Sequence, residues 1–162
     1  TGVVLDLRGN PGGLLTEAVE VASQFLDGGA VVSYQRRDEP VVHLDALGKG
    51  NTTVPVVVLV DDGTASAAEV VAAALQDRNR AVIVGSRTYG KGSIQEPSTL
   101  SDGSAIELTV GTYLTPSGRK LDGVGIEPDV VVSTRAGSAS AEQRALEVLR
   151  GLVAASDGTA RG

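Results

Sequence analysis

The chain has 162 residues, 41% of them hydrophobic and 21% charged, which is enough for one domain with a buried core. The net charge of −6, without any basic block, argues against nucleic acid as a partner. The lack of cysteine excludes disulfides and thiolate chemistry, and a single histidine argues against a metal site, so we expect neither metal nor cofactor. No apolar run approaches the length of about 20 residues that a membrane span needs.

The first third of the chain predicts strands around one helix. We expect a strand at Val3–Leu7, an amphipathic helix over Leu14–Leu26 and a strand at Ala30–Tyr34. Residues 8–13, between the first strand and the helix, read Arg-Gly-Asn-Pro-Gly-Gly, and the glycines allow backbone shapes that other residues rarely adopt. Taken alone, this segment is explained as a strand-to-helix turn.

A second strand, Val41–Leu44, is expected to pair back on the preceding one as a hairpin. It contains the only histidine, His43, which we interpret as a surface residue of the hairpin rather than a catalytic group. The loop that follows, residues 46–53, contains two glycines and could border a substrate groove.

The middle of the chain carries the candidate chemistry. Val56–Val60 is wholly apolar, as in a strand buried on both faces, and helical character begins at Thr64. Ser66 is therefore expected at the first turn of a helix, where free amides and the helix dipole favour negative charge. The amide of Ala67 would then be an oxyanion donor beside a serine nucleophile. Ser66 and Glu69 also fit a capping box, in which the serine only satisfies backbone donors, and this segment alone leaves both readings open.

A serine nucleophile needs a base, and Lys91 is the candidate. It lies in Tyr-Gly-Lys-Gly-Ser, just after a predicted strand at Ala81–Val84, and its flanking glycines permit a tight turn. A lysine serves as a general base when burial lowers its pKa toward neutrality. Gln95 could orient the amine without adding a negative charge. Residues 85–92 approach the phosphate-binding pattern GxxxxGK[ST], but Gly92 replaces the magnesium-binding hydroxyl, so we reject nucleotide binding.

The next segment predicts strands joined by turns. Residues 96–104 are polar with a turn at Asp102-Gly103, and Ala105–Leu114 alternates as a half-buried strand with Ile106, Leu108 and Val110 on its apolar face. Val130–Val132 is the last short strand. The acidic residues of the intervening loop lack calcium-loop spacing and are interpreted as solvated; they are Asp122, Glu127 and Asp129.

A flexible link at residues 135–139 precedes the closing helix. A capping box at Ser140 should open this helix, which should run to about Ala155, with residues 156–162 frayed. One apolar face should dock on the body; it comprises Ala145, Leu146, Leu149, Leu152 and Val153. The alternation of strands and helices predicts an α/β core with a largely parallel sheet at residues 1–135, followed by the C-terminal helix and tail at residues 136–162.

Two motifs together resemble the C-terminal-processing, or tail-specific, serine peptidases. They are Gly-Thr-Ala-Ser-Ala-Ala-Glu at residues 63–69 and Gly-Lys-Gly-Ser-Ile-Gln at residues 90–95, and residues 8–13 and 113–129 are similar to the family as well. The resemblance covers about residues 3–132 and implies a ClpP/crotonase-like β-β-α core. Many members of the family have a serine at the position of Ala68, which is not one of the three positions to which the family pattern assigns catalysis.

The resemblance also implies roles for individual residues. Ser66 would be the nucleophile, Lys91 the general base and Gln95 the partner of the lysine. The amide of Ala67 and that of Gly12, or else Gly13, would form the oxyanion hole.

The implied activity is hydrolysis of proteins or peptides with apolar C-terminal tails through an acyl-enzyme, without cofactor or metal. The implied location is extracytoplasmic. Oligomeric state and membrane association of a longer parent stay open. Members usually recognise tails through a PDZ domain, and none is visible here. The chain has no methionine and is expected to be a processed or excised piece.

Two other function classes remain. One is a non-catalytic ligand- or peptide-binding module on the same fold. The other is an acyl-CoA enzyme of the crotonase type, which uses a glycine oxyanion device but needs no serine–lysine pair.

Overall fold

The computed structural model describes residues 1–133 and 138–159. In chain order the elements are β1 (Val3–Asp6), α1 (Leu15–Ser23), β2 (Ala30–Arg36), β3 (Val42–Asp45), β4 (Val56–Val60), α2 (Ala67–Asp77), β5 (Val82–Gly85), β6 (Ser93–Thr99), β7 (Ala105–Leu114), β8 (Val130–Val131) and α3 (Ser138–Thr159). In that part of the chain no helix combines the length and apolar character that a membrane crossing requires.

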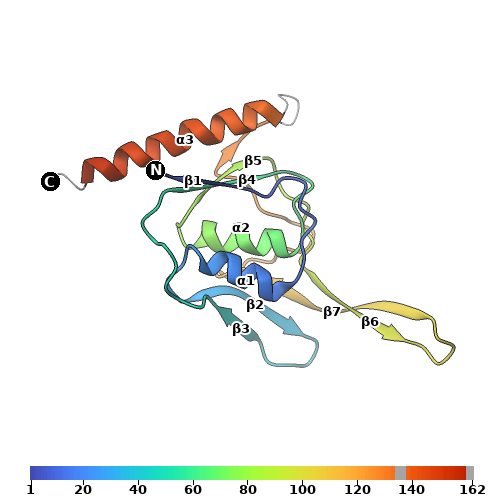
Figure 1. Ribbon diagram of the computed structural model, residues 1–162. Helices are drawn as coiled ribbons and strands as arrows, with labels where there is room; N and C mark the ends of the chain where they lie inside the picture. Colours follow the sequence, from blue (N-terminus) through green and yellow to red (C-terminus); the bar gives the residue numbers. More distant parts are fainter. Residues whose placement is uncertain (134–137, 160–162) are drawn as a thin grey trace.

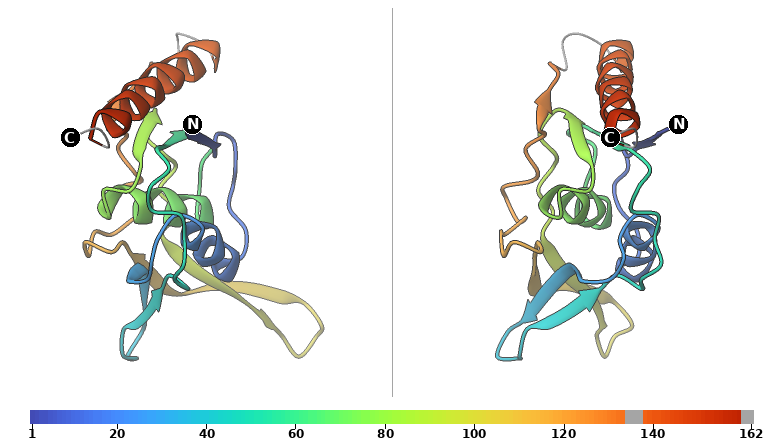
Figure 2. Two further views of the ribbon diagram at one scale, coloured as in Figure 1. Left: turned by 60° about the vertical axis from the view of Figure 1, so that its left-hand side comes forward. Right: turned by 90° about the vertical axis from the view of Figure 1, so that its left-hand side faces the viewer.

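The strands form two sheets of different kinds. One is parallel, in the order β1-β4-β5-β8, and the other is antiparallel, in the order β3-β2-β7-β6. Helices α1 and α2 lie between the sheets, and α3 covers the outer face of the parallel sheet (Figure 1; Figure 2). The predicted α/β class with a parallel sheet is confirmed, but the hairpin strands form a complete second sheet.

Strand β4 is buried on both faces, as its apolar run predicts. Val56, Val58 and Val60 face the core that contains α1 and α2, whereas Val57 and Leu59 face the cluster beneath α3. Successive side chains of a strand point to opposite faces, so a helix on each side demands an apolar residue at every position. The loop that leaves the carboxyl end of β4 is therefore anchored by a fixed strand.

Helix α2 is more deeply buried than one apolar face predicts. Every residue from Ala67 to Leu75 is buried. The helix is enclosed by α1 and by both sheets, and its alanines let these neighbours approach closely. This burial extends to Glu69, which has no exposed surface.

The segment read as polar and turn-rich contains an edge strand that sequence analysis missed. Strand β6 pairs with β7 from Ser93 to Thr99, with Pro97 inside it. The two strands form a ribbon that extends away from the body (Figure 1). The expectation that Ile106 and Leu108 are half-buried is wrong, because no other described element packs over the outer part of the ribbon and both are more than 40% exposed.

Helix α3 docks on the parallel sheet as expected. Ala145, Leu149 and Leu152 pack against the cluster formed by β4 and β5. Leu146 is 45% exposed and does not belong to the docked face. The helix begins at Ser138, two residues before Ser140, and continues to Thr159. The predicted link at residues 138–139 and the predicted fraying at residues 156–159 are therefore wrong, because the helix includes both segments. The rest of these two predictions falls on residues 134–137 and 160–162, which lie outside the described residues.

Candidate active site

Ser66 occupies the turn between β4 and α2. It is the residue that precedes the first turn of the helix, and its φ of 54° and ψ of −121° are values that non-glycine residues rarely adopt. Such strain persists only where the surroundings hold the backbone in place, and it often marks a functional residue. A serine on a sharp strand-to-helix turn presents its hydroxyl at the end of the sheet.

The loop after β1 is fixed against this turn. Thr64 Oγ1 donates to the carbonyl of Leu7 at 2.8 Å, and the amide of Ala65 donates to the carbonyl of Asn10 at 2.9 Å. Asp61 Oδ1 accepts the amide of Gly9 at 2.8 Å. These bonds place the Pro-Gly-Gly segment beside Ser66.

The structure brings Gly12, rather than Gly13, into contact with the Ser66 turn. Gly12 has a φ of 109°, and a Cβ atom at this position would lie 2.9 Å from Ser66 Cβ and 3.0 Å from the amide nitrogen of Ala67. A Cβ on Gly13 would have open space around it. The amide of Gly12 donates to Asn10 Oδ1 at 2.9 Å, so an incoming oxyanion would have to share or displace this acceptor.

Lys91 lies in a turn that is held by a segment distant in sequence. Its neighbours Gly90 and Gly92 are buried, and a Cβ on Gly92 would lie 2.2 Å from the amide nitrogen of Asp122. The carbonyl of Gly90 accepts the amide of Gly123 at 2.9 Å. The loop at residues 121–125 therefore supports the lysine turn.

Glu69 joins the two motifs through one carboxylate. Its Oε2 accepts the backbone amide of Ser66 at 2.9 Å and that of Lys91 at 2.8 Å. Its Oε1 accepts the amide of Gly90 at 2.8 Å and the hydroxyl of Thr88. Four donors satisfy this fully buried carboxylate, and the backbone amides of the candidate nucleophile and base meet at one of its oxygen atoms.

The sequence pattern predicts only a capping-box role for Glu69. That box is present, but the serine–glutamate spacing carries no information on the partners at residues 88–91. A glutamate in an otherwise apolar stretch of helix does indicate a buried carboxylate, and such a carboxylate needs hydrogen-bond donors from elsewhere in the fold.

The side chains of Lys91 and Gln95 are both exposed, in contrast to the burial expected for the lysine. No hydrogen bond joins Lys91 to Ser66 or to Gln95 within residues 1–133 and 138–159. Gln95 lies on β6 opposite Thr109, next to a register shift in the ribbon. The geometry therefore converges at the backbone, while the amine remains in contact with solvent.

His43 is an exposed residue of the β2–β3 hairpin, as expected. Its Nδ1 lies 2.8 Å from Ser33 Oγ across the hairpin. Over the described ranges, no group of three or more histidine or acidic side chains is placed to hold a metal ion.

A small cavity lies directly beside Gly12 and Ala67. It has a volume of about 150 Å³ and is formed between α1 and α2. Its apolar lining consists of Leu7, Leu14, Ala18, Val21, Ala68 and Val71. The polar residues Asn10 and Glu17 also line it. The arrangement offers an apolar recess next to the candidate oxyanion donors.

Comparison with known proteins relates the chain to peptidases. The model for "Peptidase family S41" matches residues 1–132. A carboxy-terminal-processing protease from Bartonella bacilliformis is 48% identical over 133 residues, which cover 81% of this chain and 31% of that protein. The chloroplastic carboxyl-terminal-processing peptidase 3 of Arabidopsis thaliana is 47% identical over 133 residues, covering 81% of this chain and 26% of that protein.

A solved structure agrees with these sequence matches. The photosystem II D1 C-terminal processing protease superimposes with a TM-score of 0.73 at 42% identity, covering 82% of this chain and 34% of that one. The matched segment spans 26% to 34% of the length of these relatives.

Proposed function

Because the chain belongs to peptidase family S41, we propose that it is the catalytic core of a C-terminal-processing serine peptidase that acts through Ser66 and Lys91. The observation that carries this proposal is the shared contact of both residues with Glu69 Oε2. This contact supports a single site formed by two residues that lie 25 positions apart in the chain.

In the proposed reaction, the neutral amine of Lys91 takes the proton of the Ser66 hydroxyl as the oxygen attacks the scissile carbonyl carbon. The amides of Ala67 and Gly12 stabilise the oxyanion. The lysine ammonium then protonates the leaving amine as the C–N bond breaks, and water hydrolyses the acyl-enzyme. Since Lys91 is exposed here, bound substrate must exclude water from its amine, and Gln95 is the proposed group that orients it.

The substrates we propose are proteins or peptides with apolar C-terminal tails. The cavity between α1 and α2 supports this proposal, because its lining is largely aliphatic and its volume suits one aliphatic side chain beside the oxyanion donors. We further infer an extracytoplasmic or lumenal location, supported by bacterial and chloroplastic relatives.

The test is cleavage of an unstructured peptide with an apolar tail. Ser66→Ala and Lys91→Ala should each abolish cleavage without changing the thermal midpoint, whereas Lys49→Ala, which removes a lysine outside the site, should retain full activity. Full cleavage by either active-site variant refutes the assignment.

A non-catalytic binding module on the same fold is the alternative. The exposed Lys91 and the lack of a hydrogen bond from it to Ser66 among the described residues favour this alternative. A serine-reactive fluorophosphonate separates the two: a peptidase is labelled at Ser66, and a binding module stays unlabelled.

A further inference from the structure

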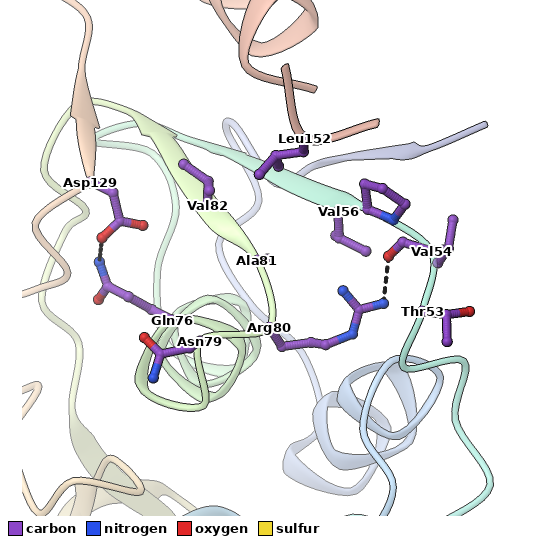
Figure 3. A pocket seen from close by; sticks show the side chains of 11 residues that line it. Thr53, Val54, Val56, Gln76, Asn79, Arg80, Ala81, Val82, Asp129 and Leu152 are labelled. Carbon is purple, nitrogen blue, oxygen red and sulfur yellow. Dashed lines mark hydrogen bonds between the residues drawn. The ribbon is translucent and has the colours of Figure 1, made fainter. Parts of the chain in front are cut away.

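A second cavity lies at the edge of the parallel sheet opposite the candidate active site. Its volume is about 360 Å³, within the range of small-ligand pockets. Val56 and Val82, the first residues of β4 and β5, line it, whereas Ser66 follows the carboxyl end of β4. Leu152 of α3 also lines it and lies above β4 and β5 in the view of Figure 3. We call it the Arg80 pocket.

Arg80 is a fixed cation at one side of this pocket. Its Nε donates to the carbonyl of Phe25 at 2.8 Å, and its Nη2 donates to the carbonyls of Asn51 and Val54 at 2.8 and 2.7 Å. The guanidinium also lies 6.0 Å from the centre of the Phe25 ring. Burial lowers the pKa of Arg80 from its ordinary value.

Nothing in the described chain neutralises this charge. Arg80 forms no ion pair with residues 1–133 or 138–159, and its Nη1 makes no hydrogen bond to them. Three carbonyls already hold the guanidinium in place. A ligand that binds Nη1 therefore causes little further loss of conformational entropy in the arginine side chain.

Asp129 is the corresponding anion at the other side of the pocket. Its carboxylate accepts Gln76 Nε2 at 2.9 Å and the amide of Ile83 at 2.7 Å, and it too forms no ion pair with the described residues. Figure 3 shows Asp129 and Arg80 on opposite sides of the start of β5, with Val82 and Ala81 between them. Two opposite charges that form no ion pair within the described residues thus lie on either side of apolar side chains.

We propose that the Arg80 pocket binds a short apolar peptide whose two termini are free. The carboxylate of the peptide binds Arg80 Nη1, its ammonium faces Asp129, and its aliphatic side chains contact Val82 and Leu152. A simple anion would be repelled by the carboxylate of Asp129, and a simple cation would be repelled by the guanidinium of Arg80. A ligand that carries both charges therefore fits this pattern best. Such peptides are also products of C-terminal processing. The connection between the pocket and this processing rests on the proposed function, whereas the proposed binding of the peptide does not depend on it.

Calorimetry with the dipeptide Ala-Val tests the proposal, using the whole chain with Ser66→Ala so that no turnover occurs. We expect saturable binding below about 10 mM, with methyl NMR shifts at Val82 and Leu152. Amidation of the dipeptide C-terminus and acetylation of its N-terminus should each weaken binding at least about tenfold, because each removes one charge-assisted contact. Absence of binding, equal binding of the capped dipeptides, or shifts confined to the surroundings of Ser66 would overturn it.

Variants assign the two ends of the ligand. Arg80→Gln should abolish binding, and Arg78→Gln is the matched control, because Arg78 donates to the carbonyls of Gly28 and Ala30 and does not line the pocket. Asp129→Asn should weaken Ala-Val but leave the N-acetylated dipeptide unaffected. If Arg80→Gln fails to fold, the Asp129→Asn variant and the capped dipeptides still test whether the pocket binds both ends of the peptide. Lys91→Ala should bind normally, which separates this proposal from the proposed function.

Discussion

Glu69 is the residue on which the candidate site depends most. A buried carboxylate without a cationic partner is costly unless donors surround it, and here two of its four donors are the amides of Ser66 and Lys91. The carboxylate therefore holds the backbones of the two motifs together. We propose that its role is to position the two motifs rather than to take part in the chemistry.

Replacing Glu69 by Gln should cost both stability and turnover. The glutamine amide would direct N–H groups at backbone donors, and one unsatisfied buried group costs about 1–3 kcal/mol. We expect kcat to fall on the order of 100-fold with little change in KM, because misplacement of the base affects the transition state more than binding. Steady-state kinetics together with chemical denaturation measure the two effects. A variant that loses stability but keeps its kcat would show Glu69 to be purely structural.

Gly12 and Gly13 form a pair of adjacent positions with different surroundings. An alanine at Gly12 would have its Cβ 2.9 Å from the carbonyl oxygen of Ala65 and would also require a φ of 109°. Gly12→Ala should therefore displace the oxyanion donors and reduce kcat on the order of 100- to 1,000-fold. Gly13→Ala, with open space around its Cβ, should stay near wild type. Equal losses in both variants would contradict the assignment of Gly12.

At the scale of single elements, the carboxyl end of α2 is tied to the turn at residues 115–119. Asp77 accepts the amide and hydroxyl of Ser117 at 2.9 and 2.6 Å and forms an ion pair with Arg119. Burial by itself raises the pKa of Asp77, but hydrogen bonds from Ser117, Thr115 and Arg119 outweigh it and hold the pKa below its usual range.

A lowered native pKa makes the contribution of Asp77 dependent on pH. The stabilisation is present above the unfolded-state pKa of about 3.9 and is lost as pH falls through the lower native value. Asp77→Asn should therefore reduce the free energy of unfolding by about 1 kcal/mol at neutral pH, and the difference from wild type should shrink near about pH 3. Urea denaturation at both pH values checks this. The control is Asp38→Asn at a fully exposed position, which should have little effect at either pH, whereas a constant Asp77→Asn difference would argue against a charge effect.

Strand β6 is an element that the local sequence pattern does not predict. Its residues are mostly polar and include Pro97, and both features disfavour a central strand. It forms because it is an edge strand paired only with β7, so one side of its backbone needs no partner in the sheet. The register of that pairing is a tertiary property that local composition does not encode.

For the whole molecule, stability should be distributed unevenly. The parallel sheet is covered on both faces, whereas the outer part of the β6–β7 ribbon exposes Leu100, Ile106 and Leu108. An isolated two-stranded ribbon is marginally stable in water. We expect the amides of residues 98–106 to exchange with deuterium orders of magnitude faster than those of β4, which should open only on global unfolding. Comparable protection of the two regions would indicate that the ribbon is covered in solution.

Much of the fold and part of the site were predictable from the sequence. The apolar run of β4, the alternation of β7 and the helix after Thr64 are local patterns, and each appears close to its predicted bounds. The two motifs around Ser66 and Lys91 identify the family by residue type and separation. The sequence by itself therefore determined the α/β class, the family and the candidate nucleophile and base.

Only the tertiary structure decided how these pieces meet. Glu69 contacts residues 88–91, and Gly12 rather than Gly13 lies next to Ala67. Arg80 and Asp129, which form no ion pair within the described residues, line the same pocket. No local pattern in the sequence relates these segments to one another. The physical reason is that propensity and periodicity act over a few residues. A buried carboxylate or a fixed guanidinium, in contrast, is satisfied by whichever distant donors and acceptors the packing of helices and sheets brings within hydrogen-bonding distance.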